Sequence, residues 1–158
     1  MNPKDLIRTL GLEPHPEGGY YAQIFKSALS LATPQGPRPA ATAIYFLLEA
    51  GDFSAWHRVR SDEVWHFYAG EGLELHLLTE AGEYSKVRMG PNVMQGEEPQ
   101  AVVPAGVWQA ARPLGAYALV GCTVAPGFAF ADFELPTRED LQRRFPRHAE
   151  VIGQLTRE

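Results

Sequence analysis

Hydrophobic and polar residues alternate in short runs through the middle of the chain. About ten runs rich in Tyr, Phe, Val, Ile and Leu are separated by turn sequences that contain Gly, Pro, Asp or Glu. The runs cover residues 19–25, 42–49, 53–59, 63–69, 73–80, 84–89, 100–103, 107–112, 117–125 and 128–133. Short strands at this spacing are typical of an antiparallel sandwich or barrel, not of a parallel α/β sheet. We therefore predict an all-β fold with a barrel at about residues 19–133.

Both ends of the chain carry residues that are typical of the first and last positions of short helices. Asn2 can cap a helix at about residues 3–10, with Pro3 in its first turn and Gly11 just after its end. Thr137 can cap a second helical region at about residues 137–156. The polar segment 30–39 is predicted to be a long loop that is either mobile or a lid.

Composition narrows the class of protein. The chain has 158 residues and a formal net charge of −5, so we predict one domain over residues 1–158 and no nucleic-acid partner. Apolar runs of membrane-spanning length and a secretion signal are both absent from the sequence, which favours a cytoplasmic protein without a membrane partner. Cys122 is the single cysteine and lies in an apolar run, so we expect a buried thiol.

The spacing of a few residues resembles a known pair of motifs. Gly51 is followed by five residues and then His57, with Glu63 and Gly70 further on, and a second motif, PAGVWQ, occupies residues 104–109. This pattern resembles the two motifs of the cupin superfamily. The resemblance implies a double-stranded β-helix, the cupin jelly-roll barrel, with both motifs facing its interior.

The likeness is more specific than the superfamily. Four segments, at residues 14–27, 56–73, 102–113 and 124–135, resemble a cupin branch whose members have no established reaction. The branch is similar in fold to dTDP-4-dehydrorhamnose 3,5-epimerase, which acts on nucleotide sugars without a metal. The resemblance also implies a homodimer.

The sequence departs from the metal-binding cupin pattern at two positions. Val59 replaces the second histidine of the first motif, and Gln109 replaces the histidine of the second motif. Valine cannot ligate a metal and a neutral amide is a weak ligand, so a metal or other cofactor is not expected. A divalent metal held by His57, Glu63 and Gln109 is the alternative. Strand alternation places His66 on the opposite face from these residues.

We expect catalysis, if the protein is an enzyme, to rest on His57 as general base. Glu63 is either its orienting partner or the second member of an acid–base pair across the substrate. Gln109, Trp65, Glu17 and Tyr20 are the candidate ligand-binding residues, and an N-terminal segment that crosses the mouth of the barrel would place His15 near the ligand together with Glu17 and Tyr20. Trp56 and Trp108 are expected in the core or an interface, and His76 and His148 are expected to be structural. Asp132, in the run at residues 128–133, is a further candidate acid in the pocket.

Three functions therefore remain open. The first is a metal-independent isomerase or epimerase that acts on a sugar nucleotide or another small carbonyl compound. The second is a metal-dependent cupin enzyme with a reduced ligand shell. The third is a non-catalytic binder or sensor of a small molecule in the barrel.

Overall fold

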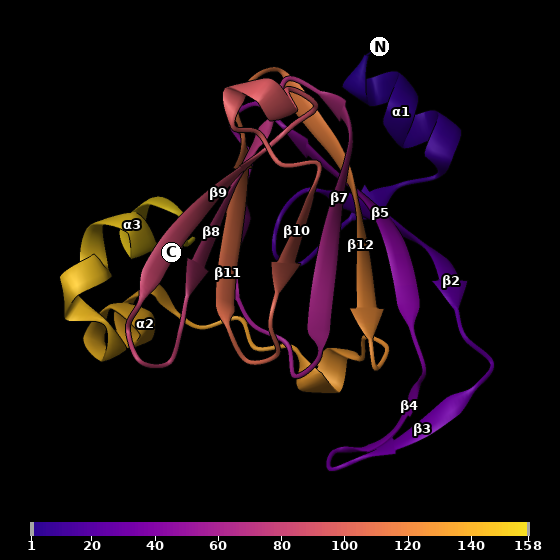
Figure 1. The fold of residues 1–158 in the computed structure, drawn as a ribbon, viewed down its shortest axis with the longest axis vertical. Coiled ribbons are helices and arrows are strands. Elements are labelled where there is room, and N and C mark those ends of the chain that lie inside the picture. The colour runs from indigo at the N-terminus through magenta and orange to yellow at the C-terminus, as the bar shows by residue number, and fades with distance from the viewer. Residues whose placement is uncertain (1, 158) are drawn as a thin grey trace.

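The computed structural model describes residues 2–157, and its strands form two large antiparallel sheets and one hairpin (Figure 1). The six-stranded sheet has the order β1-β2-β5-β12-β7-β10 and the four-stranded sheet has the order β6-β11-β8-β9. The strands of the first sheet are β1 (Glu13–Pro14), β2 (Tyr20–Lys26), β5 (Thr42–Glu49), β7 (Asp62–Gly70), β10 (Gln100–Val103) and β12 (Tyr117–Ala125). Those of the second are β6 (Ser54–His57), β8 (Leu73–Leu78), β9 (Tyr84–Met89) and β11 (Trp108–Pro113). This is the predicted jelly-roll barrel, which is confirmed.

The main core lies between the two sheets. Phe46, Trp65 and Val120 from the six-stranded sheet pack in one buried cluster with Leu75 and Leu77 from the four-stranded sheet. Alternation along each strand sends these side chains inward, because successive residues point to opposite faces. Packed side chains therefore fill this part of the barrel interior. The cavity described below lies next to this packed core.

Cross-strand register brings the two sequence motifs together. His57 on β6 is the direct partner of Gln109 on β11, and Glu63 on β7 is the partner of Val124 on β12. β12 is hydrogen-bonded to β5 on one side and to β7 on the other, so it is a central strand of its sheet. Residues far apart in sequence thus approach the same end of the barrel.

The predicted helices are present at both ends of the chain. Helix α1 (Pro3–Leu10) begins after Asn2, whose side chain accepts a hydrogen bond from the Lys4 backbone N–H, and ends at Gly11 with φ 66°. Thr137 caps α2 (Arg138–Arg144), which is followed by the 3₁₀ turn η3 (Pro146–His148) and α3 (Ala149–Gln154).

The C-terminal helices cover the outer face of the four-stranded sheet (Figure 1). Trp56 and Trp108 are buried there against Leu141 and Ile152, in agreement with the expectation of a core position. Across residues 2–157, the helices all fall short of the length and apolar character needed to cross a membrane.

Two predictions of local structure are wrong. Residues 30–39 form a hairpin of β3 (Ser30–Thr33) and β4 (Gly36–Pro39), which projects from the barrel (Figure 1). Its turn is closed by Thr33, whose hydroxyl donates to the Gly36 carbonyl at 2.6 Å, and Gly36 has φ 113°.

The second wrong prediction is the strand at residues 128–133. The chain forms the 3₁₀ turn η2 (Phe130–Asp132) there. The Asp132 carboxylate accepts two hydrogen bonds, of 2.8 and 2.9 Å, from Arg38 of the hairpin. We call residues 128–133 the phenylalanine segment.

A candidate acid–base cavity

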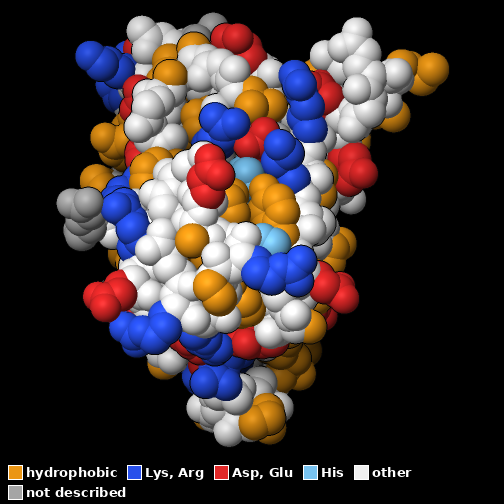
Figure 2. All heavy atoms as spheres, turned by 90° about the vertical axis from the view of Figure 1, so that its left-hand side faces the viewer, with side chains coloured by type: hydrophobic (Ala, Val, Ile, Leu, Met, Phe, Trp, Pro, Cys, Tyr) orange, Lys and Arg blue, Asp and Glu red, His pale blue; other side chains and the backbone are white. Residues whose placement is uncertain are grey.

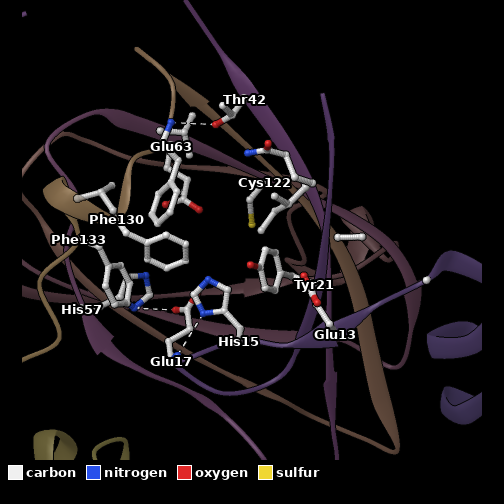
Figure 3. Close-up of a pocket in the computed structure, with 17 residues that line it drawn as sticks. Glu13, His15, Glu17, Tyr21, Thr42, His57, Glu63, Cys122, Phe130 and Phe133 are labelled. Atoms are coloured by element: carbon white, nitrogen blue, oxygen red, sulfur yellow. Dashed lines mark hydrogen bonds and ion pairs between the residues drawn. The ribbon is translucent and has the colours of Figure 1, made fainter. Parts of the chain in front are cut away.

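One cavity of about 450 Å³ lies at the end of the barrel where the motifs meet (Figure 3). It is lined from β1, β2, β5, β6, β7, β12 and the phenylalanine segment. The lining residues are Gly11, Glu13, His15, Glu17, Tyr21, Ala22, Gln23, Thr42, Ile44, His57, Val59, Glu63, Cys122, Val124, Phe128, Phe130 and Phe133. This size is within the usual range of small-molecule sites.

Glu17 and His57 form a buried ion pair in this cavity. Nδ1 of His57 lies 2.8 Å from Oε2 of Glu17 and 2.7 Å from the carbonyl oxygen of Ala55. Ser54 also donates its hydroxyl to the Glu17 carboxylate. Because Nδ1 is occupied and no described residue hydrogen-bonds Nε2, the imidazole can offer only Nε2 to a ligand.

The pair shifts the pKa of both members. Burial alone would lower the pKa of His57, but the charge and hydrogen bond of Glu17, the charge of Glu63 and the Ala55 carbonyl raise it to about 9. Burial alone would raise the pKa of Glu17, yet the charge and hydrogen bond of His57 lower it. At neutral pH the pair is therefore an imidazolium and a carboxylate.

His15 lies on the other side of the same carboxylate and is in a different protonation state. Its Nδ1 accepts a hydrogen bond from the Glu17 backbone N–H at 3.1 Å, so Nδ1 carries no proton. Burial, with a smaller effect of the nearby His57 charge, lowers the pKa of His15 against the opposing charge of Glu17. His15 is thus a neutral imidazole whose proton is on Nε2.

Glu63 is held by a chain of two buried hydrogen bonds. The Trp65 indole N–H donates to Oε1 of Gln109 at 2.9 Å, and the Gln109 amide donates to Oε1 of Glu63 at 2.9 Å. Burial and the charge of Glu17 raise the pKa of Glu63, although His57 and Gln109 act in the opposite direction. A raised pKa makes the Glu63 carboxylate a stronger base than an exposed glutamate.

Cys122 is buried beside Glu63, as the sequence predicted for its thiol. Burial and the charges of Glu63 and Glu17 raise the pKa of the Cys122 thiol well above its ordinary value. The thiol therefore stays protonated and is no nucleophile at neutral pH.

An aromatic wall completes the cavity. The rings of Phe128 and Phe130 have centroids 4.9 Å apart, and those of Phe130 and Phe133 are 6.1 Å apart, both pairs edge to face. The Phe133 ring also lies 5.4 Å from the His57 ring. The side of the cavity that carries His57 thus adjoins an aromatic, apolar wall (Figure 3).

The structure brings together three of the residues predicted from the sequence and separates three others from the cavity. Glu17, His57 and Glu63 line it. Gln109 and Trp65 lie behind Glu63, with exposures of 0% and 2%, and position it instead of facing a ligand.

Tyr20, the third separated residue, packs in the cluster beneath helix α1. Its neighbour Tyr21 lines the cavity instead, because adjacent strand residues point to opposite faces. The partner predicted for His57 was Glu63, but the carboxylate in contact with its Nδ1 is that of Glu17. His15, expected near a ligand together with Glu17, also lines the cavity, whereas Tyr21 was missed as a site residue.

The remaining histidines lie away from the cavity. His66 is hydrogen-bonded to Thr123 at 3.2 Å. His76 lies in a shallower hollow on the face that carries α2 and α3, where its Nδ1 meets the Tyr84 hydroxyl at 2.6 Å and His148 also contributes. Figure 2 shows histidine side chains on this face among basic and hydrophobic neighbours.

Donor geometry does not fit a metal at the motif positions. Both polar atoms of Gln109 are engaged by Trp65 and Glu63, and the side chain is fully buried. Val59 has no donor atom, so only His57 and Glu63 remain, fewer than the three or four ligands of a usual site. Within residues 2–157 no group of three or more His, Cys, Asp or Glu side chains is arranged to hold a metal ion.

Asp132 was a candidate acid in the pocket, and the structure places it elsewhere. Its carboxylate is bound by Arg38, and hydrogen bonding to this guanidinium keeps the pKa of Asp132 low. It is absent from the cavity lining and anchors the phenylalanine segment to the hairpin.

Comparison with known proteins finds one matching protein family and solved structures that match nearly the whole chain. Residues 4–136 match the family model of the cupin superfamily described as DUF985. A hypothetical protein from Leishmania major is 35% identical over 100% of both chains with a TM-score of 0.95. A protein from Shewanella oneidensis is 38% identical over 99% of this chain and 98% of its own, with a TM-score of 0.92.

More distant structures share the fold alone. The oxalate decarboxylase of Lactobacillus farciminis, solved as a formate complex, is 13% identical with a TM-score of 0.60 and aligns over 93% of this chain and 42% of its own. Curated proteins gave no match.

Proposed function

The chain belongs to the cupin superfamily, in the family described as DUF985, and we propose that its barrel binds a small carbonyl compound and moves a proton next to the carbonyl group without a metal. Such a protein would be an isomerase or epimerase. The observation that carries the proposal is the presence, in one cavity, of the Glu17–His57 ion pair and a separate buried carboxyl group, Glu63.

The proposed reaction has two steps. The Glu63 carboxylate takes a proton from the carbon next to the carbonyl, while the carbonyl oxygen accepts a hydrogen bond or the proton from Nε2 of His57. The enol or enolate that forms is then protonated on carbon while the oxygen returns its proton to His57. For an isomerase Glu63 delivers its proton to a neighbouring carbon; for an epimerase a water molecule on the opposite face supplies the proton, and Glu63 releases its own to solvent. No redox partner is needed, because the substrate and product are isomers.

Each role follows from the chemistry of the side chain. His57 carries a positive charge at neutral pH, so it stabilises negative charge on the oxygen. The neutral His15 offers a second N–H, from Nε2, to the same side of the cavity. Glu17 fixes the orientation of His57 and keeps it charged.

This assignment differs from the expectation in one respect. From the sequence, His57 was the general base. A histidine with a pKa near 9 is almost entirely protonated at pH 7 and is suited to act as the acid. The proposal therefore gives the role of base to Glu63.

Self-association is a second part of the proposal. The outer edge of β2 is covered by β1 only at Tyr20 and Tyr21. Beyond that point Ile24 and Phe25 are 54% and 53% exposed, and Leu29, just before the hairpin, is 64% exposed. We propose that a second copy of the chain covers this edge and the hairpin, since an open apolar edge strand favours pairing.

The proposed reaction is tested by incubating the protein in D₂O with small carbonyl compounds and measuring deuterium at the carbon next to the carbonyl. We expect exchange that Glu63→Gln and His57→Gln each abolish. Ligand binding without exchange would instead support a non-catalytic binder. Exchange that requires added metal would support a metal-dependent cupin.

A further inference from the structure

Resting on the proposed function, we infer that the substrate is an uncharged carbonyl compound that carries a flat aromatic ring, and that phosphorylated compounds, nucleotide sugars included, are not substrates. Four features of the cavity support this substrate class: the charges of its lining, the aromatic wall, the contacts that hold that wall in place, and the volume.

The lining is acidic. Glu13, Glu17 and Glu63 contribute carboxyl groups, and among the described lining residues none is Lys or Arg. Proteins bind phosphate groups with Arg, Lys or clusters of backbone N–H groups. His57 is the one cationic group indicated in the lining, and Glu17 already neutralises it. A diphosphate would therefore meet carboxyl groups without compensating cations.

The aromatic wall offers a surface for a ring. Phe128, Phe130 and Phe133 come from six consecutive residues and all line the cavity. Phe130 is 54% exposed, so a ligand ring packed against it would remove apolar surface from water. The Phe133 ring is 5.4 Å from the His57 ring, so a ligand ring packed on this wall lies near the His57 imidazole.

The wall is held in place by hydrogen bonds from neighbouring elements. The Phe128 N–H donates to the Thr42 hydroxyl at 2.9 Å, and Arg38 binds Asp132 through both Nε and Nη2. Just beyond the segment, Glu134 and Arg58 exchange two backbone hydrogen bonds of 3.0 and 3.1 Å. The phenylalanines are therefore positioned without a ligand, which reduces the entropy that binding would cost.

A volume of about 450 Å³ sets an upper limit on size. A compound of one or two rings with a short carbonyl side chain fits this volume, in the range of small-molecule pockets. A nucleotide sugar would need to place its base, ribose and diphosphate beyond the lining residues.

The test compares four probes: phenylacetone, 4-methyl-2-pentanone as its alkyl counterpart, dihydroxyacetone phosphate, and a thymidine diphosphate 4-keto sugar. Binding is measured by saturation-transfer NMR, and proton transfer by deuterium incorporation in D₂O. We expect phenylacetone to bind and exchange, the alkyl ketone to do so roughly tenfold less well, and neither phosphorylated probe to compete.

Two variants link the preference to the wall. Phe130→Leu should reduce the preference for the aryl ketone by roughly threefold to tenfold. Phe25→Leu is the matched control, because Phe25 is exposed on β2, lies outside the cavity lining, and stays hydrophobic as leucine.

Each outcome bears on one claim. Equal use of the alkyl ketone, exchange of a phosphorylated probe, or failure of all four probes to bind would overturn the substrate class. Binding of phenylacetone that depends on Phe130 but gives no exchange would support the class and contradict the proposed proton transfer. Exchange of the alkyl ketone alone would contradict the class and leave the proton transfer standing.

Discussion

Nδ1 of His57 lies 2.8 Å from Oε2 of Glu17, although the two residues are 40 positions apart and belong to different parts of the fold. The segment that carries Glu17 is held against β6, because the Ala55 N–H donates to the Glu17 carbonyl at 2.8 Å. The carboxylate and the imidazole are therefore fixed by the same pair of backbone segments. This relationship determines the protonation state of the cavity.

Replacement of Glu17 tests that statement. In Glu17→Gln the charge that raises the pKa of His57 is lost while burial remains, so the pKa should fall from about 9 by at least one unit. The measurement is an NMR titration of the His57 ring in both proteins. Glu13→Gln, a change at an exposed residue of the same cavity, is the control and should leave the titration unaltered. A His57 pKa that is the same in Glu17→Gln and the wild type would contradict the account.

The dependence of stability on pH follows from the same pair. Folded His57 keeps its proton to about pH 9, whereas an unfolded histidine loses it near 6.5. The stabilisation is thus fully present below about pH 6.5 and is lost as pH rises through 9. The loss is on the order of 3 kcal/mol in the free energy of unfolding. Glu17, Glu63 and His15 face His57. The raised pKa of Glu63 also lowers stability as pH rises, but this loss begins near the ordinary glutamate pKa, below the range in which His57 titrates.

Urea unfolding at several pH values checks this prediction. The free energy of unfolding should decline between pH 6.5 and 9 in the wild type, and the decline should be clearly smaller in His57→Gln. At low pH the lowered pKa of Glu17 acts in the opposite direction, so stability should also fall as pH falls through the pKa of that carboxyl. Parallel curves for the two proteins above pH 6.5 would show that His57 is not the group responsible.

The contact between the hairpin and the phenylalanine segment predicts a local effect. Asp132→Asn weakens both hydrogen bonds from Arg38, so the segment should open more often. Amide hydrogen exchange in residues 127–135 should become faster, by up to about tenfold, with little change in the strands of the four-stranded sheet. Asp140→Asn, at an exposed position in α2, is a control that should leave residues 127–135 unaffected. An unchanged exchange rate in Asp132→Asn would mean that the ion pair does not hold the wall.

The exposed edge of β2 predicts self-association. Light scattering after size exclusion should give a mass near twice the 17.5 kDa of the chain. Ile24→Lys should shift the protein toward the monomer, because a charge is placed on the apolar edge. Val93→Lys, at an exposed apolar residue outside the proposed interface, should not. A monomer at all concentrations would rule out this association.

The strand pattern was sufficient to predict most of the fold. β5, β9, β10 and β12 occupy the predicted residues because each is a run of alternating or buried apolar side chains bounded by turn residues. The hairpin at residues 30–39 was missed because β3 is a short run without a clear apolar pattern and β4 contains two prolines. The phenylalanine segment was misassigned because its turn is stabilised by Arg38, more than ninety residues earlier in the sequence.

Part of the site could be predicted from the two motifs and from the N-terminal segment that carries Glu17. His57 and Glu63 occupy motif positions, so they could be named from spacing. The pairing of Glu17 with His57 depends on how the N-terminal segment crosses β6, which no local pattern specifies. The choice between Tyr20 and Tyr21 required the register of β2 against β5. The positioning roles of Gln109 and Trp65 depend on two buried side-chain hydrogen bonds, from Trp65 to Gln109 and from Gln109 to Glu63, which the sequence alone does not show.

In the proposed reaction Glu63 and His57 move a proton from the carbon next to the substrate carbonyl without a metal. The most direct measurement is deuterium incorporation into phenylacetone in D₂O by protein treated with a chelator and shown by metal analysis to be metal-free. The account predicts exchange at the same rate before and after treatment, at least 100-fold slower in Glu63→Gln, a typical effect of losing a general base. Exchange that disappears with the chelator and returns with a divalent metal, or that persists unchanged in Glu63→Gln, would contradict it.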